Sequence, residues 1–464
     1  MAARPLGPVT VAADPAARSG RASHPGLLVA ALAAGLLAQV VLLHVAHVPT
    51  ERPLVGDEGL YRAAARRIAS DQPVTPTFLH PPLYPRFLAA VERVLGPERI
   101  AVELVQSGLL LLGGLLLWAL LGRAGLGPAA RGSGLALFLL DPQVGAFAQY
   151  LWPEVLHLVL VLLGLWLLVG PLGSGGVAAF LAGGAFGLAV LTKSLVLPFV
   201  PVLLGVAALG AASPAAPARA ARAAAFAAGL LVLLVPVAVA NGWRHGYWGI
   251  ADSGSFNAWV GLNDPANRHD YDSVVGRAWG EYLASSADPG ERRRLARAAV
   301  ARTVSREGPL HVFSAQLGKQ YGRLLDRESF FTDQLPGGRL RPGAPPRSRD
   351  RWLRAWGYGA YAAVLVLAGL GVGLADWRRA GRRCALPALF LAYNAALFLV
   401  LHVKTRYRFA FLPCLVFFGA LAIDRLAAEP GFFSSDRGKR RLALGVALGG
   451  GLLFLAFGRA CPPA

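Results

Sequence analysis

The chain has 464 residues, of which 55% are hydrophobic and 16% charged, with a mean hydropathy of +0.49. Ordinary soluble proteins carry about 25% charged residues, so this composition excludes that class and indicates a membrane protein with many spans. The formal net charge is +20, and the arginines are spread between apolar stretches, with no recognition helix or zinc module. We therefore expect membrane lipids and phosphate as partners, and no nucleic acid.

The N-terminal part of the chain predicts a tail followed by an anchor. Residues 1–25 are rich in Ala, Pro and Arg without periodicity, which predicts a disordered cytoplasmic tail. The apolar run that follows is about twice as long as the core of a secretion signal. Its small residues could resemble a signal cleavage site, but no globular sequence follows them. We interpret it as a retained span, so that 26–464 form one membrane domain.

The apolar stretches predict an all-α polytopic protein. A hydrocarbon core about 30 Å thick needs roughly 20 helical residues, and this rule predicts about eleven spans. They lie near 26–48, 101–122, 132–148, 153–171, 176–192, 194–211, 222–241, 356–375, 385–402, 408–425 and 441–458. The spans between 132 and 211 follow one another with little loop, so their boundaries stay open.

Basic residues in the short loops predict the orientation. With the N-terminus in the cytoplasm, the basic residues of these loops lie inside: Arg123 and Arg131, Arg219 and Arg222, Arg378–Arg383, and Arg437–Arg441. Two longer segments, 49–100 and 242–355, then face the outside, where long loops translocate regardless of charge. We expect a multi-pass protein of the plasma (inner) membrane.

The first outer loop, 49–100, predicts two amphipathic helices. Apolar residues recur at helical spacing from Asp57 onward and again after Pro85. Such helices should lie in the interface plane. Between them, the run 78–85 contains three prolines and predicts a stiff, extended connector.

The second outer segment, 242–355, predicts a small cap rather than a separate catalytic domain. Its beginning, 241–265, is a turn-rich run that should cross the outer surface. Helices are expected over 277–306 and 309–328. The Pro/Gly/Arg-rich stretch 333–350 predicts a loose loop.

One short outer loop breaks the charge rule. The link between the ninth and tenth predicted spans reads His402-Val403-Lys404-Thr405-Arg406-Tyr407-Arg408. Near mid-membrane each such cation costs about 2.5–3.5 kcal/mol, so a bound phosphate would explain the cluster, because arginine matches phosphate oxygens. The alternative is that these side chains snorkel and anchor two helix ends. Lys193, between the fifth and sixth spans, has the same two explanations.

Acidic residues are predicted on the same membrane face. Asp57 and Glu58 follow the first span, and they could also cap the interfacial helix. Glu154 follows Pro153 at the start of the fourth predicted span, and both proline and acidic residues are common in the first turn of a helix. With His157 it forms a Glu-x-x-His pair, but no partner pair is visible, so we predict no metal ligand there. We expect Glu154 to line the same cavity as Asp57.

These acids and cations together predict a reaction at a lipid phosphate. The cations are Lys193, Lys404, Arg406 and Arg408. A carboxylate can take a proton from a hydroxyl while cations stabilise a departing phosphate. A transporter or flippase for a lipid-linked sugar is the alternative, although we find no corresponding halves of the kind transporters show. A membrane scaffold would leave the outer cations unexplained.

Several of these motifs resemble one family. Gly56-Asp57-Glu58 through Tyr61 resembles the acidic motif of GT-C membrane glycosyltransferases. The run His80-Pro81-Pro82-Leu83-Tyr84-Pro85 is similar to the connector of the branch with protein O-mannosyltransferases, aminoarabinose transferases and the RgtA/B/C/D-like transferases of lipopolysaccharide cores. Leu191–Lys193, the Asn241 to Asn263 run and Arg406–Arg408 also resemble that branch. The likeness covers residues 26 to about 425.

The resemblance implies a GT-C-like bundle and an inverting glycosyltransferase. Such an enzyme takes a sugar from a polyprenyl-phosphate donor and passes it to a glycan, lipid or protein acceptor outside the cell. Asp57 would be the base, with Glu58 and Glu154 as acidic neighbours. The implied substrate contacts are Tyr61, His80, Tyr84, Lys193, Lys404, Arg406 and Arg408.

The chain also departs from that branch. Aminoarabinose transferases have a Glu-Lys pair before the proline of the connector, where Leu79-His80 stands here. No particular metal site is therefore predicted; a divalent metal stays open, and no other cofactor is expected. We expect no large soluble C-terminal domain of the oligosaccharyltransferase kind, which disfavours transfer of a whole preassembled glycan.

Overall fold

The computed structural model describes residues 25–44, 52–72, 78–169, 175–210, 215–263, 271–338, 341, 343–377, 381–428 and 434–458. Over these residues the protein is helical and contains no strand. The tail predicted over 1–25 lies, apart from its last residue, outside the described residues. The all-α class predicted from the sequence is confirmed.

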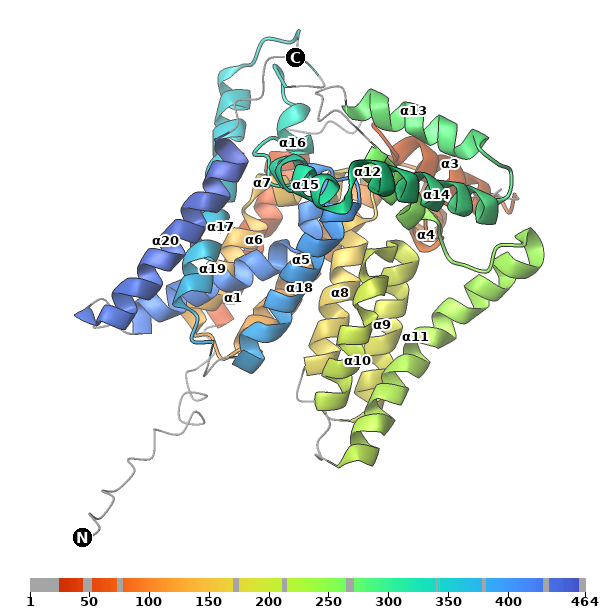
Figure 1. The fold of residues 1–464 in the computed structure, drawn as a ribbon. Coiled ribbons are helices and arrows are strands. Elements are labelled where there is room, and N and C mark those ends of the chain that lie inside the picture. Colours follow the sequence, from red (N-terminus) through yellow and green to blue (C-terminus); the bar gives the residue numbers. More distant parts are fainter. Residues whose placement is uncertain are drawn as a thin grey trace.

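Most helices form one bundle (Figure 1). Its members are α1 (Pro25–Leu37), η2 (Ala38–Leu43), α5 (Arg99–Arg123), α6 (Pro128–Leu139), α7 (Pro142–Ala146), η3 (Phe147–Gln149), α8 (Glu154–Val169), α9 (Gly176–Thr192), η5 (Ser194–Phe199), α10 (Val200–Leu209), α11 (Ala216–His245), α17 (Ser348–Leu374), α18 (Gly381–Val400), η6 (Thr405–Ala410), α19 (Leu412–Ala428) and α20 (Asp436–Phe457). Every predicted span overlaps one or more of these helices.

The predicted number of spans is not confirmed. Among the described residues, five helices are long and apolar enough to cross a membrane, and a sixth crossing is possible if the bent pair Pro142–Gln149 and Glu154–Val169 counts as one. The two parts of that pair meet at 111°. Several other bundle helices, such as α9 with 17 residues, are shorter than the roughly 20 residues that a full crossing needs.

The prediction of one continuous helix over 132–148 is wrong. Helix α6 ends at Leu139, and α7 begins after Asp141, whose carboxylate accepts a hydrogen bond from the Gln143 backbone N–H at 2.8 Å. A residue that precedes proline avoids the helical region, and Asp is a favoured helix cap. Asp141-Pro142 therefore stops one helix and starts another.

Small residues let two long helices, α17 and α20, approach closely. A Cβ on Gly369 would lie 2.3 Å from the backbone N of Gly449, and one on Gly373 would lie 2.4 Å from that of Gly445. Both helices thus contribute a G-x-x-x-G pattern to one contact. Packing of this kind stabilises helix pairs inside membranes, where lipid removes the hydrophobic driving force.

Shorter helices cover one end of the bundle (Figure 1). We call them the cap helices: α3 (Glu58–Ala69), α4 (Leu83–Leu95), α12 (Ser253–Asn263), α13 (Tyr271–Ala284), α14 (Pro289–Glu307), α15 (Pro309–Leu324) and α16 (Phe330–Asp333). The two helices predicted in the first outer loop are α3 and α4. The extended connector predicted over 78–85 ends at Pro82, because Leu83 and Tyr84 already belong to α4, whose first turn accommodates Pro85.

Two predictions for the second outer segment are corrected. The run 241–265 contains a helix, α12, because Phe256 and Val260 pack with Leu79 in a buried cluster that outweighs the local turn preference. The single helix predicted over 277–306 is two helices, α13 and α14. The break occurs where Asp288 caps α14 by accepting from the backbone N–H groups of Gly290 and Glu291.

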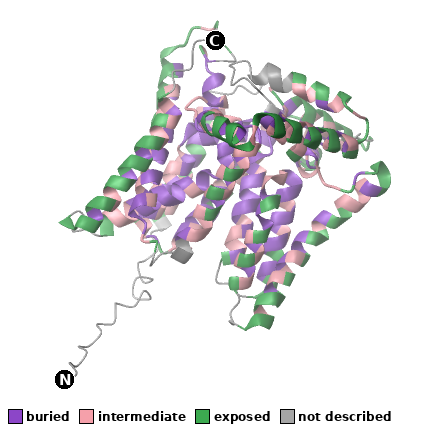
Figure 2. Ribbon diagram, in the orientation of Figure 1, coloured by how far each residue is buried: buried purple, intermediate pink, exposed green. Residues whose placement is uncertain are grey.

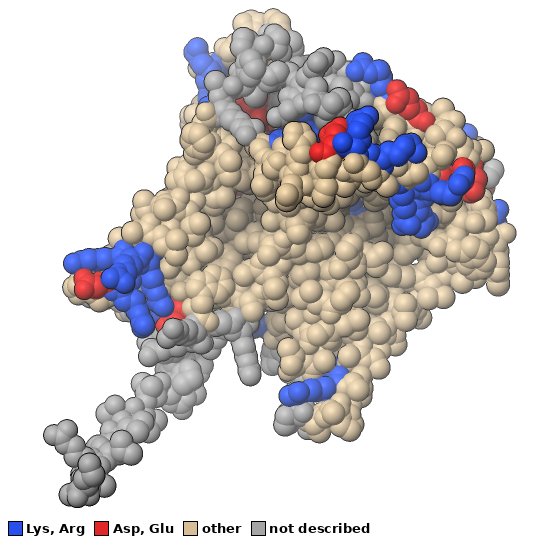
Figure 3. Space-filling view, viewed as in Figure 1, with Lys and Arg blue, Asp and Glu red and all other residues tan. Residues whose placement is uncertain are grey.

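The surface of the bundle suits lipid. Figure 2 shows buried residues along the inner faces of the bundle helices and exposed residues along α11 and α20. The exposed side chains of α11 include Leu231, Val232 and Val235, at 50%, 56% and 48% exposure. Figure 3 shows Lys and Arg near the cap helices and at the opposite end, with a broad uncharged belt between them. A multi-pass membrane protein has this distribution.

Candidate active site

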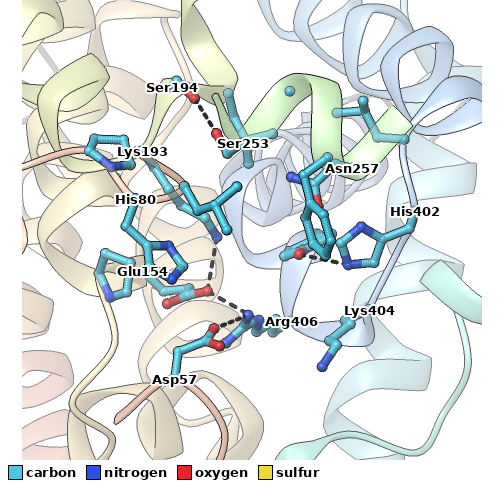
Figure 4. A pocket seen from close by; sticks show the side chains of 18 of the residues that line it. Asp57, His80, Glu154, Lys193, Ser194, Ser253, Asn257, His402, Lys404 and Arg406 are labelled. Atoms are coloured by element: carbon cyan, nitrogen blue, oxygen red, sulfur yellow. Dashed lines mark hydrogen bonds and ion pairs between the residues drawn. The ribbon is translucent and has the colours of Figure 1, made fainter. Parts of the chain in front are cut away.

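A cavity of about 200 Å³ lies where the cap helices meet the bundle. Segments far apart in the sequence form its wall (Figure 4). The charged and polar side chains that line it are Asp57, Tyr61, His80, Glu154, Lys193, Ser194, Ser253, Asn257, Trp279, His402, Lys404, Arg406 and Tyr407. Apolar residues of several segments, among them Leu195 of η5 and Phe398 of α18, line the rest.

Four charged side chains form a chain of ion pairs in this cavity. Arg406 Nη2 lies 2.6 Å from Asp57 Oδ2, and Arg406 Nε lies 3.8 Å from Glu154 Oε1. Lys193 Nζ lies 2.9 Å from the same Glu154 oxygen. Figure 4 shows Arg406 between the two carboxylates, with Lys193 on the far side of Glu154.

Arg406 is held by its neighbours. It belongs to the short helix η6, which begins after an extended stretch whose His402 N–H donates to the Asn257 carbonyl at 2.8 Å. Its guanidinium carbon lies 5.0 Å from the Trp152 ring centroid, within cation–π range. Its side chain is 10% exposed. The loop that broke the charge rule therefore points one arginine into the cavity.

Asp57 faces the cavity rather than its own helix. It occupies the N-cap position of α3, yet its side chain makes no capping hydrogen bond. The capping interpretation is thus wrong for Asp57. Burial by itself would raise the pKa of this carboxyl, but the positive charge of Arg406 and its hydrogen bond hold the pKa well below the usual value.

Glu58 does not line the cavity. Its buried carboxylate accepts two hydrogen bonds from the Arg52 guanidinium, at 2.7 and 2.8 Å, and others from the backbone N–H groups of Val55 and Leu151. These bonds connect the loop before α3 to the short segment between η3 and α8. Glu58 therefore has the contacts of a positioning residue, not those of an acid facing substrate.

His80 and Tyr61 line the cavity and contact each other. The Tyr61 hydroxyl lies 3.2 Å from His80 Nδ1. Burial lowers the pKa of His80, so the ring is neutral near pH 7. His80 Nε2 is buried and has no hydrogen-bond partner among the described residues. A buried polar atom without a partner is costly, and a bound ligand would supply one.

Tyr84 and Arg408, predicted as substrate contacts, are not among the residues that line the cavity. The Tyr84 hydroxyl donates to Gln106 Oε1 at 2.9 Å inside the bundle. Arg408 donates to the Gln143 side chain, and its guanidinium carbon lies 4.0 Å from the Tyr361 ring centroid. Neither side chain contacts the cavity that holds Asp57. Instead, Tyr84 connects α4 to α5, and Arg408 connects η6 to α7.

The second outer segment contributes side chains to the cavity that were not among the predicted site residues. Ser253 and Asn257 of α12 line the cavity, as does Trp279 of α13. The Ser253 hydroxyl lies 3.0 Å from that of Ser194, so it links α12 to η5. Polar residues in a turn-rich run are common, so the resemblance of the Asn241 to Asn263 run to the GT-C branch and its predicted outer position did not single out these residues.

No metal cluster is present among the described residues. They contain no group of three or more His, Cys, Asp or Glu side chains that could hold an ion. Glu154 and His157, which have Glu-x-x-His spacing, have separate partners: Lys193 for the acid and the Ala189 carbonyl for His157 Nδ1.

Comparisons with known proteins show the fold. No protein-family model matches the sequence, and no curated protein matches it. The apo oligosaccharyltransferase of Archaeoglobus fulgidus matches with a TM-score of 0.52 and 13% identity, over 94% of this chain and 55% of that chain. AglB of the same organism, in complex with an inhibitory peptide and a dolichol-phosphate, matches with a TM-score of 0.50 and 14% identity, over 94% and 54%.

A third match is ArnT of Cupriavidus metallidurans bound to undecaprenyl phosphate, with a TM-score of 0.39 and 17% identity, over 91% of this chain and 85% of that chain. The chain spans about half the length of the oligosaccharyltransferases. At these identities the likeness shows the fold alone. The likeness to the two oligosaccharyltransferase structures confirms the fold that the sequence motifs led us to expect.

Proposed function

We propose that the protein is a glycosyltransferase that moves one hexose or pentose from a polyprenyl-phosphate-linked donor to an acceptor on the extracytoplasmic face of the plasma membrane. The GT-C fold supports glycosyl transfer in general. The observation that carries the proposal is the convergence of Asp57, Glu154, Lys193 and Arg406 on one cavity at the membrane boundary. The acceptor is a glycan, a lipid or a protein.

The charge of the cavity suits a donor with one phosphate. Its ionised wall residues are the cations Lys193, Lys404 and Arg406 and the carboxylates Asp57 and Glu154. The cations exceed the carboxylates by one, and burial keeps His80 neutral. A sugar phosphodiester of a lipid carries a single negative charge, so it would balance the site without a metal.

The reaction follows from this arrangement. The acceptor hydroxyl oxygen attacks the anomeric carbon while the bond from that carbon to the phosphate oxygen breaks. The phosphate leaves with the bonding electrons, stabilised by Lys193 and Arg406, and Asp57 takes the hydroxyl proton. Attack from the side opposite the phosphate inverts the anomeric configuration.

Substrate binding would activate Asp57. A base whose pKa lies far below the working pH is weak, and the ion pair with Arg406 keeps the pKa of Asp57 low. A donor phosphate that takes over the hydrogen bonds of Arg406 would weaken its pair with Asp57. The carboxylate would then become more basic when a donor is present.

An apolar cavity of about 290 Å³ offers a path for the lipid tail. It lies among α5, α8, α10, α18 and α19, and Phe199 of η5 and Phe390 of α18 belong to its wall. The same two elements, through Leu195 and Leu397, also line the polar cavity. The two cavities therefore follow one seam, with the polar cavity at the end nearer the cap helices.

The experiment is transfer by the purified protein in liposomes with envelope lipid extract as donor source. We expect Asp57→Asn to lower turnover by roughly 100- to 10,000-fold, the range for a positioned base, without loss of folding. Asp71→Asn is the control, because Asp71 pairs with Arg93 at the surface and its side chain is 90% exposed. Normal turnover by Asp57→Asn would overturn the proposal, and donor movement without a glycosidic bond would favour the flippase alternative.

A further inference from the structure

A second cleft, of about 400 Å³, lies on the cap side of the molecule where the end of α11 meets the first turns of α14. Tyr247 and Trp248 form one side, and Arg293, Arg294 and Arg297 form the other. It is separate from the candidate active site, although one segment lies between them. Asp252 contacts Arg293 on the cleft side, and the next residue, Ser253, lines the active-site cavity.

The cleft has an excess of positive charge. Helix α14 contains six arginines and two glutamates, and Figure 3 shows Lys and Arg gathered at this part of the surface. The acids that face the cleft arginines are Asp252, 3.5 Å from Arg293, and Glu291, 2.6 Å from Arg294. Arg297 is exposed, and no ion pair is assigned to it among the described residues.

Aromatic residues place the cleft at the membrane boundary. Trp243 near the end of α11 is 80% exposed and Trp248 is 64% exposed, and exposed Trp residues are enriched where lipid headgroups meet water. Partly exposed apolar side chains continue along α11 as far as Val239. At 1.5 Å per residue, Trp243 lies about 6 Å farther along the helix, which is within a headgroup layer roughly 5–8 Å deep on each side.

We propose that this cleft binds the phosphate headgroup of an anionic lipid in the membrane leaflet on the cap side. Guanidinium groups match phosphate oxygens, and the wall of the cleft contains three of them. They lie beside the Trp248 indole, which can contact the acyl chains of the same lipid. Trp243, Trp248 and the lipid-facing side of α11 favour a membrane lipid over an anion in solution. The inference stands apart from the glycosyltransferase proposal, because it concerns lipid binding alone.

The test compares two double variants on one helix. Arg294→Gln with Arg297→Gln removes two of the three cleft arginines, while Arg302→Gln with Arg306→Gln removes two arginines farther along α14. Each pair contains one arginine with a glutamate partner, Glu291 or Glu307, so the two variants are matched. The probe is phosphatidylglycerol added to detergent-solubilised protein, with phosphatidylcholine as the uncharged-headgroup comparison, and native mass spectrometry counts the retained lipid.

We expect wild type and the Arg302/Arg306 variant to retain phosphatidylglycerol over phosphatidylcholine, and the Arg294/Arg297 variant to bind it at least about tenfold more weakly. Equal affinity in all three proteins, or an equal loss in both variants, would overturn the site. Glycerol 3-phosphate at equal concentration should not displace the lipid; complete displacement would mean that a soluble anion is the ligand, which would contradict the proposal.

A second measurement does not depend on the arginines. Dibrominated phosphatidylglycerol quenches nearby tryptophan fluorescence, so it should quench wild type more strongly than Trp248→Phe. Dibrominated phosphatidylcholine should show a smaller difference between the two proteins. Equal quenching of wild type and Trp248→Phe by the anionic lipid would place the lipid elsewhere.

Discussion

Arg406 is the residue on which the electrostatics of the candidate site depend. It contacts Asp57 directly and lies within ion-pair distance of Glu154. Two like charges in a buried cavity would otherwise repel each other and favour protonation. The Arg406 guanidinium therefore offsets this repulsion, together with Lys193 beside Glu154, and still faces the space where we place the donor phosphate.

This role gives a prediction on pH. In wild type the acid limb of kcat/KM should lie below the usual range for a carboxylic acid, because the pKa of Asp57 is lowered. In Arg406→Gln the lowering charge is gone while burial still raises the pKa, so the acid limb of the residual activity should move to higher pH. Coincident acid limbs in pH–rate profiles of the two proteins would contradict the role of Arg406.

Glu58 gives a prediction on stability. Its side chain is fully buried and that of Arg52 is 8% exposed, so removal of the acid leaves a buried cation without its partner. Breaking such a pair costs about 3–5 kcal/mol. Glu58→Gln should therefore lower the thermal unfolding temperature in detergent.

The neighbouring Asp57→Asn is the matched comparison for Glu58→Gln, because the Asp57 side chain is 26% exposed and Arg406 keeps Glu154 as a second acidic partner at 3.8 Å. It should lower turnover and change the unfolding temperature little. If Glu58→Gln proved as stable as wild type, the assignment of Glu58 as a positioning residue would be wrong.

At the scale of elements, close helix contacts set the shape of the bundle. The α17–α20 contact depends on glycines that leave no room for a side chain, whereas a Cβ on the adjacent Gly450 would meet nothing within 4 Å. Gly449→Leu should therefore lower the unfolding temperature in detergent, and Gly450→Leu should not. Equal stability of the two variants would show that this contact is dispensable.

The seam between η5 and α18 gives a further prediction. Leu386 lines the apolar cavity, while Leu389 on the same helix is 49% exposed on the outside. Leu386→Trp should raise KM for a long-chain donor more than for a short-chain analogue, because the indole fills the path of the tail. Leu389→Trp is the control. An equal effect of Leu386→Trp on both donors would show that the donor tail does not bind in this cavity.

The elements that the sequence predicted well are those with a strong single signal. Apolar stretches marked the helices of the bundle, and helical periodicity marked α3 and α4. The errors occur where a local signal competes with tertiary packing, as in α12, or where an Asp-Pro pair splits a helix, as at Asp141 and at Asp288. These pairs were visible in the sequence and would have shown both breaks.

At the scale of the whole molecule, the membrane explains why part of the site could be predicted. Charge rules assigned Asp57, Glu154, Lys193 and Arg406 to one face, which confines them to a thin layer, and the structure brings all four together. The rules could not tell which way each side chain points. Glu58 and Arg408 each directly follow a cavity residue, Asp57 and Tyr407, yet both side chains turn toward other elements.

The central claim is that this cavity transfers sugar, and the most direct test is mass spectrometry of envelope glycolipids and glycoproteins. Cells that lack the gene would be complemented with wild type, Asp57→Asn or Asp71→Asn at equal expression. We predict that one component gains the mass of a single sugar residue with wild type and with Asp71→Asn, and not with Asp57→Asn. Full restoration of that component by Asp57→Asn would contradict the account.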